Sequence, residues 1–491
     1  MIPKKHQSLF LLVVAFIYVA TRFAMVYQKT YLLNDEIASR IVMSGKGVSV
    51  VTWYKEAQKK KVWLNKEQII DEMDIDDAHL NLQGVSEMLE YNDIHPPLYF
   101  WIGNAWCSVF GFGVKSVLWL HLLFEILTLL LIYRLLNQFN FYSRVISMAF
   151  ALIIITHPFF SESFILIRHY SLLALLSTSL LFSVFNYYNK AKAVNHWLWI
   201  LFGVVFLGSL THFIFTTLVF AILTSILAVK KKTNHFFMAS IASLLAFALA
   251  AALNWDLFKK LILLQKTYDN SSLDYYLNYL AAIPSRIILT RRMVQFLPTI
   301  ILVLSWVIIP WFIVKSKKES IAKALLLFVF AHFIIIIALV ILDKTPFHSL
   351  VSNRYYVGTA AASFIALFLL AKNYLTQKTV WIIGSIFCIY GGLLSTYQAR
   401  KPMVENMLSE KAYIVEPGLM YLGLTAQIMN TNQQVRIISL NEIKDLEQNT
   451  NHIIIADKNI ETLKEYFSDN HLKITHNYPC PSWSMIKFNK P

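Results

Sequence analysis

Two adjacent acids, Asp35 and Glu36, follow the first long apolar segment of the chain, which runs from about Ser8 to Val26. That segment is long enough to cross a bilayer, so both carboxylates are predicted to lie just outside a membrane face. A carboxylate held there can act as a general base that takes a proton from an attacking hydroxyl. Two solvated acids after a membrane exit fit the pattern equally well. Adjacent side chains diverge on a helix, so only one can face a given substrate, and we predict Asp35.

A histidine followed by two prolines, His95-Pro96-Pro97, closes the loop that the two acids open. The prolines fix the backbone at a helix start, which would hold His95 in one orientation at the membrane surface, where it can meet a lipid phosphate. A helix-initiating turn with an ordinary exposed histidine explains the same residues equally well. The sequence keeps both interpretations open.

Arg168, His169 and Tyr170 stand where the third apolar segment ends and the fourth begins. Arginine suits phosphate because its planar guanidinium binds two oxygens at once and stays charged at a partly dehydrated interface. A snorkelling arginine beside an interfacial tyrosine is the alternative, and on local evidence it is the more frequent case. The same two interpretations apply to other residues on this predicted side, namely Arg286, Arg291, Arg292, Arg354, Tyr355 and Tyr356.

Three further polar residues interrupt apolar segments. His121 and Glu125 lie four residues apart within one segment, and hence on one helix face. An ionisable residue in a span is a functional candidate, yet a buried pair in which each satisfies the other is the more frequent arrangement. His212, at the tip of a predicted hairpin, is either a pocket residue or part of a polar turn.

No cofactor is evident and no metal site is predicted. Cys107, Cys388 and Cys480 are too scattered for a disulfide framework or a metal cluster, and the acidic run from Asp71 to Asp77 lacks the glycine and the spacing of a calcium loop. A divalent metal held by residues of separate loops is not excluded, because it would leave no local motif.

The elements that must position these residues are membrane helices. The 491-residue chain is 57% hydrophobic and 15% charged, with a mean hydropathy of +0.52, which excludes a soluble globular protein. The formal charge of +15 lies in short loops without a basic recognition module, so we predict no nucleic-acid partner. The loops on one side hold 15 Lys and Arg against one acid, Glu319, which predicts that they are cytoplasmic.

We predict about eleven spans in a domain that covers residues 1–396, with a cytoplasmic N-terminus and an outer C-terminus. This domain includes a first exoplasmic loop at 28–95 and a juxtamembrane helix at 96–113. Residues 397–491 are predicted to form a small α/β domain with strands near 435–440, 452–456, 473–476 and 485–488 and helices near 411–429 and 459–467. The predicted spans lie near 8–27, 116–133, 145–161, 170–186, 197–211, 213–229, 236–253, 294–314, 321–342, 356–371 and 379–396.

This order of features resembles the polytopic glycosyltransferases of the GT-C fold, specifically the bacterial relatives of protein O-mannosyltransferases and of the lipid A aminoarabinose transferase. The residues that carry the resemblance are Asn34-Asp35-Glu36, His95-Pro96-Pro97-Leu98-Tyr99 and Arg168-His169-Tyr170. The resemblance implies a polyprenyl-phosphate sugar donor, a site on the outer face and Asp35 as the catalytic carboxylate. It places His95 where some relatives have a lysine near the lipid phosphate.

From these observations together we expect an integral protein of a bacterial inner membrane that transfers a sugar to a hydroxyl of a glycan, lipid or protein. Asp35 and Glu36 are the expected catalytic residues, and the donor phosphate is expected to contact His95, Arg168, Tyr170, Arg286 and Arg354. His169, His212 and Tyr355 are expected pocket residues. A secondary transporter and a non-catalytic envelope-glycan assembly protein remain the alternatives; a transporter would usually show repeats and paired broken segments, and the sequence has neither.

Overall fold

The computed structural model describes residues 4–29, 32, 34–73, 80–92, 95–189, 194–263, 320–341 and 357–374. It also describes ten positions between 376 and 393 (376, 379, 381, 382, 384–386, 388, 389 and 393), residue 433, and five strands between 411 and 489. The chain forms two compact units. The first, which we call the helical unit, comprises Met1–Gln28, Ile94–Tyr99 and Leu118–Arg400. The second, the loop–sheet unit, comprises Lys29–Asp93, Phe100–Val117 and Lys401–Pro491.

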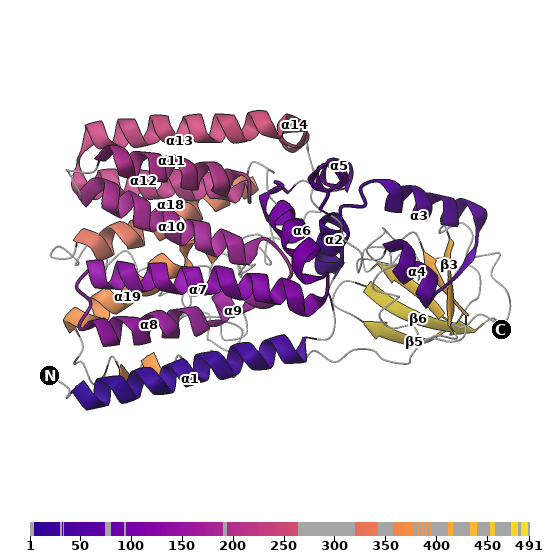
Figure 1. Ribbon diagram of the computed structural model, residues 1–491, viewed down its shortest axis with the longest axis horizontal. Coiled ribbons are helices and arrows are strands. Elements are labelled where there is room, and N and C mark those ends of the chain that lie inside the picture. The colour runs from indigo at the N-terminus through magenta and orange to yellow at the C-terminus, as the bar shows by residue number, and fades with distance from the viewer. Residues whose placement is uncertain are drawn as a thin grey trace. The chain divides into compact units, whose positions relative to one another are not determined.

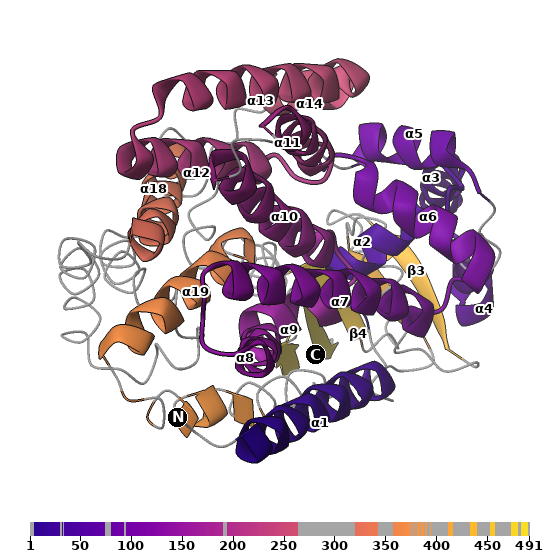
Figure 2. The ribbon, with the colours of Figure 1, turned by 60° about the vertical axis from the view of Figure 1, so that its left-hand side comes forward.

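The helical unit is a bundle in which α1 and α13 lie at opposite edges (Figures 1 and 2). Between them α12 packs against α18, α11 against α13, and α10 against α11 and α19. The helices of this unit are α1 (Lys4–Gln28), α7 (Val114–Gln138), α8 (Arg144–Thr156), α9 (Pro158–Ile165), α10 (Tyr170–Asn189), α11 (Val194–Ser209), α12 (Ile214–Lys230), α13 (Thr233–Leu253), α14 (Trp255–Leu263), α18 (Ser320–Ile341) and α19 (Val357–Tyr374).

The burial of these helices is that of a membrane bundle. Four of them, α1, α7, α10 and α13, are long and apolar enough to cross a bilayer. On α1, Leu12 and Phe16 are exposed while Val14 and Tyr18 are buried, so the helix is apolar on its outer face as well as its inner one. A helix that is apolar all round belongs in a lipid environment. The interior helix α10 is mostly buried instead.

One predicted span is divided in the structure. The segment predicted at 145–161 consists of α8, which ends at Thr156, and α9, which begins at Pro158. Proline has no N–H to donate and disfavours a helical conformation in the residue before it, and His157 accordingly has an extended backbone. The predicted span at 294–314 and half of the one at 379–396 lie outside the described residues.

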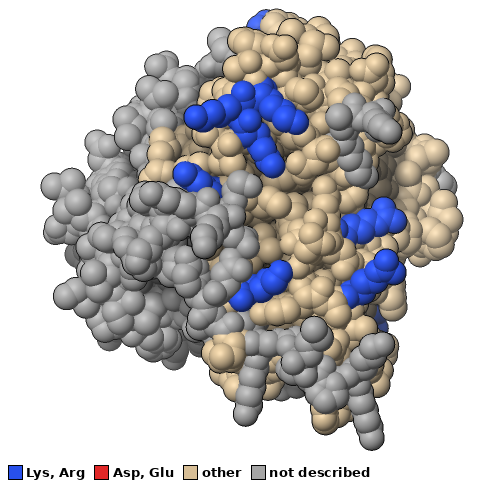
Figure 3. Space-filling view, turned by 90° about the vertical axis from the view of Figure 1, so that its left-hand side faces the viewer, with Lys and Arg blue, Asp and Glu red and all other residues tan. Residues whose placement is uncertain are grey.

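Basic residues gather at one end of the helical unit. The turns that join α7 to α8 and α12 to α13, together with the helix ends beside them, carry Arg134, Arg144 and Lys230–Lys232. The ammonium of Lys372, near the end of α19, donates to the Asn140 carbonyl at 2.7 Å, and that of Lys232 donates to the Tyr188 carbonyl at 3.0 Å. Figure 3 views the molecule from this side, and every described charged residue visible on that face is Lys or Arg.

The loop–sheet unit contains helices from the first loop and a six-stranded sheet. Its helices are α2 (Asn34–Met43), α3 (Ser49–Lys60), α4 (Lys66–Met73), α5 (Leu82–Asn92) and most of α6 (Leu98–Phe110), and its strands are β1 (Trp63–Asn65), β2 (Lys411–Val415), β3 (Gln434–Ile438), β4 (His452–Ala456), β5 (Lys473–Pro479) and β6 (Trp483–Asn489). The strand order is β1-β3-β2-β4-β6-β5. The central pairs β2–β3 and β2–β4 are parallel, and the remaining pairs are antiparallel.

The sheet differs from the predicted C-terminal domain in two respects. β1 belongs to the first loop and pairs with β3, Trp63 opposite Arg436, so the sheet combines segments from both sides of the boundary predicted at residue 396. The predicted helix at 411–429 is wrong at its start, because Lys411–Val415 is the central strand β2. Its sequence, Lys-Ala-Tyr-Ile-Val, ends in residues that favour a strand between two neighbours. The predicted helix at 459–467 lies outside the described residues.

Candidate active site

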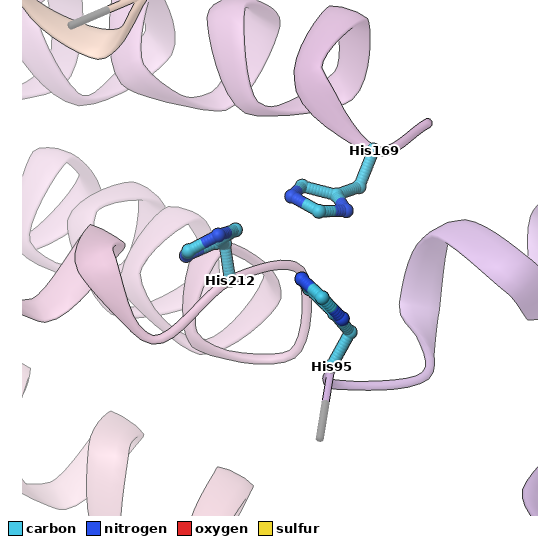
Figure 4. Close-up of side chains that lie close together, drawn as sticks. All are labelled: His95, His169 and His212. Carbon is cyan, nitrogen blue, oxygen red and sulfur yellow. The ribbon is translucent and has the colours of Figure 1, made fainter. Parts of the chain in front are cut away.

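Three histidines from distant parts of the sequence lie together in the helical unit (Figure 4). The ring centroid of His169 lies 4.7 Å from that of His95 and 4.6 Å from that of His212, and the His95 and His212 centroids are 5.6 Å apart. One ring nitrogen from each residue lies within 4.8 Å of the others. His169 is fully buried whereas His95 and His212 are half-buried, so this histidine cluster is closed on one side and accessible on another.

Each member of the histidine cluster shortly precedes the N-terminus of a helix. His95 comes before α6, His169 before α10, and His212 before α12. The Leu98 N–H donates to the Leu210 carbonyl at 2.9 Å, which joins the start of α6 to the turn between α11 and α12. The first turn of a helix has free N–H groups and a partial positive charge. Three such termini beside one cluster therefore favour an anionic ligand.

Tyr99 and His121 support the cluster from within the bundle. The Tyr99 hydroxyl lies 2.8 Å from Nε2 of His121, and Nδ1 of His121 lies 2.8 Å from the Phe164 carbonyl. A carbonyl only accepts, so Nδ1 donates to Phe164 and Nε2 accepts from the Tyr99 hydroxyl. The Tyr99 ring in turn meets His169 edge-on at 6.4 Å. The chain of contacts links a span helix to the buried member of the cluster.

Arg168 and Tyr170 flank His169 in the turn before α10. Both side chains are buried, with 7% and 4% of their surface exposed. The His169 carbonyl accepts the Leu173 N–H at 2.9 Å, so this turn leads directly into the helix. The rings of Tyr170 and His169 lie 4.3 Å apart. A snorkelling arginine keeps its guanidinium in water, whereas Arg168 is buried. A buried arginine in an apolar bundle is costly unless it has charge or hydrogen-bonding partners.

The main chain fixes the ring of His212. Its Nδ1 accepts the Ile214 N–H at 3.0 Å, in the first turn of α12. A nitrogen that accepts a hydrogen bond carries no proton, so the ring in this state is the neutral tautomer with its proton on Nε2. In this arrangement His212 offers a hydrogen-bond donor at Nε2.

The two acids predicted as catalytic have different environments in the loop–sheet unit. The Glu36 carboxylate is fully buried and accepts from the Lys29 ammonium at 2.8 Å, and Lys29 is itself buried. Asp35 lies in the first turn of α2 and is half-buried, and its carbonyl accepts the Ser39 hydroxyl at 2.9 Å. Glu36 thus balances a buried charge, while Asp35 retains an exposed fraction.

A network of amide contacts holds α2 against α5 and α6. The side chain of Asn104, on α6, donates to the Met43 carbonyl at 2.8 Å and accepts the Asn81 N–H at 3.0 Å. The side chain of Asn81 donates to the Gly45 carbonyl at 2.7 Å. Gly84 packs so closely here that a Cβ would collide with the Gly45 carbonyl oxygen. The helix that carries Asp35 is therefore fixed by buried polar contacts.

Sequence reasoning missed Arg22, which is buried in α1. Its guanidinium binds the Glu125 carboxylate of α7 at 2.6 and 2.7 Å and also donates to the Ser161 hydroxyl at 3.0 Å and the Ile155 carbonyl at 2.6 Å. The Tyr18 hydroxyl donates to the same carboxylate at 3.2 Å. An arginine inside an apolar span was the available signal. The expected mutual pair of His121 and Glu125 is corrected, because the two bind different partners.

Several predicted residues lie outside the described part of the chain. These are Arg286, Arg291, Arg292, Arg354, Tyr355 and Tyr356. The described site residues fall into both units. His95, Arg168, His169, Tyr170 and His212 belong to the helical unit, whereas Asp35 and Glu36 belong to the loop–sheet unit.

Comparisons with known proteins give one family match and two crystal structures of similar fold. Residues 94–255 match the family model of dolichyl-phosphate-mannose-protein mannosyltransferases. The crystal structure of ArnT from Cupriavidus metallidurans bound to undecaprenyl phosphate has a TM-score of 0.50 and 10% sequence identity, over 97% of this chain and 97% of ArnT. The crystal structure of ArnT in the apo state has a TM-score of 0.51 and 11% sequence identity, over 98% of this chain and 97% of ArnT. This chain has the GT-C glycosyltransferase fold. The predicted fold class, a polytopic helical membrane protein of the GT-C type, is confirmed, whereas the number of spans and the C-terminal domain stay predictions.

The family match covers one part of the chain, residues 94–255. The family match contains the histidine cluster, Arg168 and Tyr170, whereas Asp35 lies before it. At about a tenth identity the ArnT structures establish the fold alone. No curated protein has a significantly similar sequence. The roles of individual residues therefore have to be argued from their surroundings.

Proposed function

We propose that this protein is a membrane glycosyltransferase that moves a sugar from a polyprenyl-phosphate donor to an acceptor hydroxyl. The GT-C fold and the mannosyltransferase family match support a membrane glycosyltransferase with a lipid-linked donor. The observation that carries the proposal is the meeting of three helix N-termini at the turns that hold His95, Arg168 and His212. Such a place suits a phosphate at a low-dielectric boundary.

The phosphate is proposed to bind Arg168, Tyr170 and the histidine cluster. The guanidinium of Arg168 supplies a permanent charge and two parallel donors, and His212 supplies the Nε2 proton fixed by its contact with Ile214. Preorganised donors stabilise the charge that develops on a departing phosphate, and they act most strongly where water is excluded. Arg286 and Arg354 remain predicted further contributors.

The donor lipid chain is proposed to lie along an apolar surface beside the cluster, at a small hollow. The hollow borders the loops that carry His95 and His212, since Pro96, Leu210 and Phe213 are among its lining residues. Its other side is formed by residues of α13 and α14, including Phe247, Leu257 and Phe258. An apolar surface next to a phosphate-binding region is what an amphipathic polyprenyl phosphate requires.

Asp35 is the proposed general base. It would take the proton of the acceptor hydroxyl while the acceptor oxygen forms a bond to the anomeric carbon and the bond from that carbon to the phosphate oxygen breaks, which inverts the anomeric configuration. Polyprenyl phosphate leaves with the electron pair. Of the two adjacent acids Asp35 is favoured, because the Glu36 carboxylate is buried against Lys29. The mechanism requires Asp35 and the phosphate to meet during turnover.

The reaction is proposed to occur on the outer face of a bacterial inner membrane. The turns and helix ends that carry Arg134, Arg144 and Lys230–Lys232 would face the cytoplasm, as the distribution of basic residues on membrane loops predicts. The helix ends that bear the histidine cluster alternate with those turns along the chain and so belong to the opposite side. The N-terminus would then be cytoplasmic and the C-terminus periplasmic.

The experiment that tests this function is transfer from a polyprenyl-phosphate sugar by the purified protein, comparing wild type with Asp35→Asn. Removing the base is expected to lower the transfer rate by about two to four orders of magnitude. Asp71→Asn is the matched control, because Asp71 is an exposed acid of the same loop, and it should keep the wild-type rate. A normal rate for Asp35→Asn at an unchanged melting temperature would remove Asp35 from the mechanism.

The donor sugar is identified by mass spectrometry of membrane lipids. Cells that lack this chain should accumulate the polyprenyl-phosphate sugar that the protein normally consumes. Cells with the Asp35→Asn protein should accumulate the same lipid, and Asp71→Asn should restore the normal level. An unchanged lipid profile in all strains would contradict a polyprenyl-phosphate donor.

A further inference from the structure

We propose that His95, His169 and His212 form a binding site for one divalent transition-metal ion, with Zn²⁺ as the preferred metal. Each residue brings one ring nitrogen to within 4.8 Å of the other two. Three imidazoles with an open fourth position are a known ligand set for zinc, and imidazole also binds Cu²⁺ and Ni²⁺ well. The site stands on the geometry of the cluster and does not depend on the proposed transfer reaction.

The spacing of the three nitrogens is close to that of a bound metal. Zinc lies about 2.0–2.1 Å from imidazole nitrogen, so the nitrogens around it are about 3.4 Å apart. From three points within 4.8 Å of each other, each ring nitrogen has to move inward by roughly 0.8 Å or less to reach that geometry. Small side-chain rotations supply such a shift. The three rings converge on one space in Figure 4.

The surroundings of the cluster fit a metal that keeps an open position. His169 is fully buried and its ring contacts those of Tyr99 and Tyr170, which hold it in place. His95 and His212 are half-buried, so a fourth ligand can enter from their side. The nearby helix N-termini oppose a cation by itself but favour an anion beside it. A metal whose fourth ligand is an anionic oxygen fits these helix N-termini, because the anion offsets the charge of the metal.

His212 has to change its hydrogen bonding to bind a metal. Its Nδ1 accepts the Ile214 N–H, so its Nε2 carries the proton in the metal-free protein. The neutral ring can bind metal through Nδ1, or it can move its proton to Nδ1 and bind through Nε2. In both cases the contact with the Ile214 N–H is given up.

The test is titration of the metal-free purified protein with Zn²⁺ and with Co²⁺, using a purification tag without histidine. We expect one Zn²⁺ per chain by calorimetry and elemental analysis, and a Co²⁺ absorption spectrum typical of four-coordinate geometry. His169→Gln should lower the affinity at least about a hundredfold, because loss of a ligand exceeds the effect of an outer contact. His196→Gln is the matched control, since His196 is exposed on α11, and it should bind like wild type.

The stability of each variant keeps the outcome interpretable. His169→Gln should melt at the wild-type temperature without metal but lack the rise in melting temperature that Zn²⁺ gives the wild-type protein. If His169→Gln is unstable, His95→Gln, at a half-buried position, replaces it with the same expectation. Binding that survives both substitutions, or wild-type binding no tighter than an adventitious ion, would overturn the proposal. Stoichiometric metal binding in a protein without transfer activity would sustain it while contradicting the proposed function.

Discussion

Two groups of ionisable side chains lie inside the helical unit, and they are built on opposite principles. In the first, Arg22 and Glu125 carry opposite charges, come from α1 and α7, and satisfy each other through two short hydrogen bonds, with Tyr18 and Ser161 completing the network. In the second, three histidines of the same kind converge from three turns. Complementary groups satisfy each other and stabilise the bundle, whereas we propose that the three histidines gather around a ligand.

The largest effect is expected from a change in the Arg22–Glu125 ion pair. Arg22→Met leaves the Glu125 carboxylate buried without its cation, which is expected to cost about 3–5 kcal/mol of folding stability. The measurement is thermal unfolding in detergent. The double variant Arg22→Met with Glu125→Met should recover most of the loss, because a buried ion pair can be replaced by apolar residues at little net cost. A double variant as unstable as the single one would show that the network does more than balance charge.

The second-largest effect is expected at Arg168, which lies beside His169 in the turn before α10. Arg168→Lys keeps the charge but loses the planar pair of donors, so the transfer rate is expected to fall by about 10²–10³ if those donors hold the departing phosphate. The melting temperature should change little, in contrast to Arg22→Met. Kinetics on the purified protein measure the difference. Equal rates for Arg168→Lys and wild type would indicate that Arg168 is structural, like Arg22.

The smallest effect is expected at Tyr99, whose ring contacts the buried His169 of the cluster. Tyr99→Phe removes the hydroxyl that donates to His121 and leaves an apolar ring in the same place. Losing one such hydrogen bond costs about 1 kcal/mol. The equilibrium constant of unfolding and the transfer rate should therefore each change by roughly tenfold or less. A positioning role predicts a lower kcat with little change in KM. A loss as large as that of Arg168→Lys would mean that Tyr99 contacts the substrate itself.

Much of the architecture could be predicted because it depends on local patterns. Apolar runs such as those of α7 and α10 are recognisable without neighbours, and the strands at His452–Ala456 and Gln434–Ile438 follow from short runs of β-branched residues. The start of β2 was mistaken for a helix because Lys411–Val415 is too short to show a period. β1 could not be foreseen, since three residues acquire a strand conformation only through pairing with β3.

The site was predictable one residue at a time but not as a group. His95, Arg168 and His212 were recognisable from their place at the ends of apolar segments. Their convergence depends on how α6, α10 and α12 begin, and the contact between the Leu98 N–H and the Leu210 carbonyl leaves no trace in the sequence. For the same reason the partners of Arg22 were out of reach, because Glu125 lies more than a hundred residues away.

The most direct test of the account is retention of polyprenyl phosphate by the purified protein, measured by native mass spectrometry. The wild-type protein is expected to hold one lipid, and Arg168→Ala should lose it. Arg134→Ala, which removes an exposed arginine from the basic region at the other end of the helices, should hold it like wild type. Equal retention by Arg168→Ala and wild type would contradict a phosphate site at these helix N-termini.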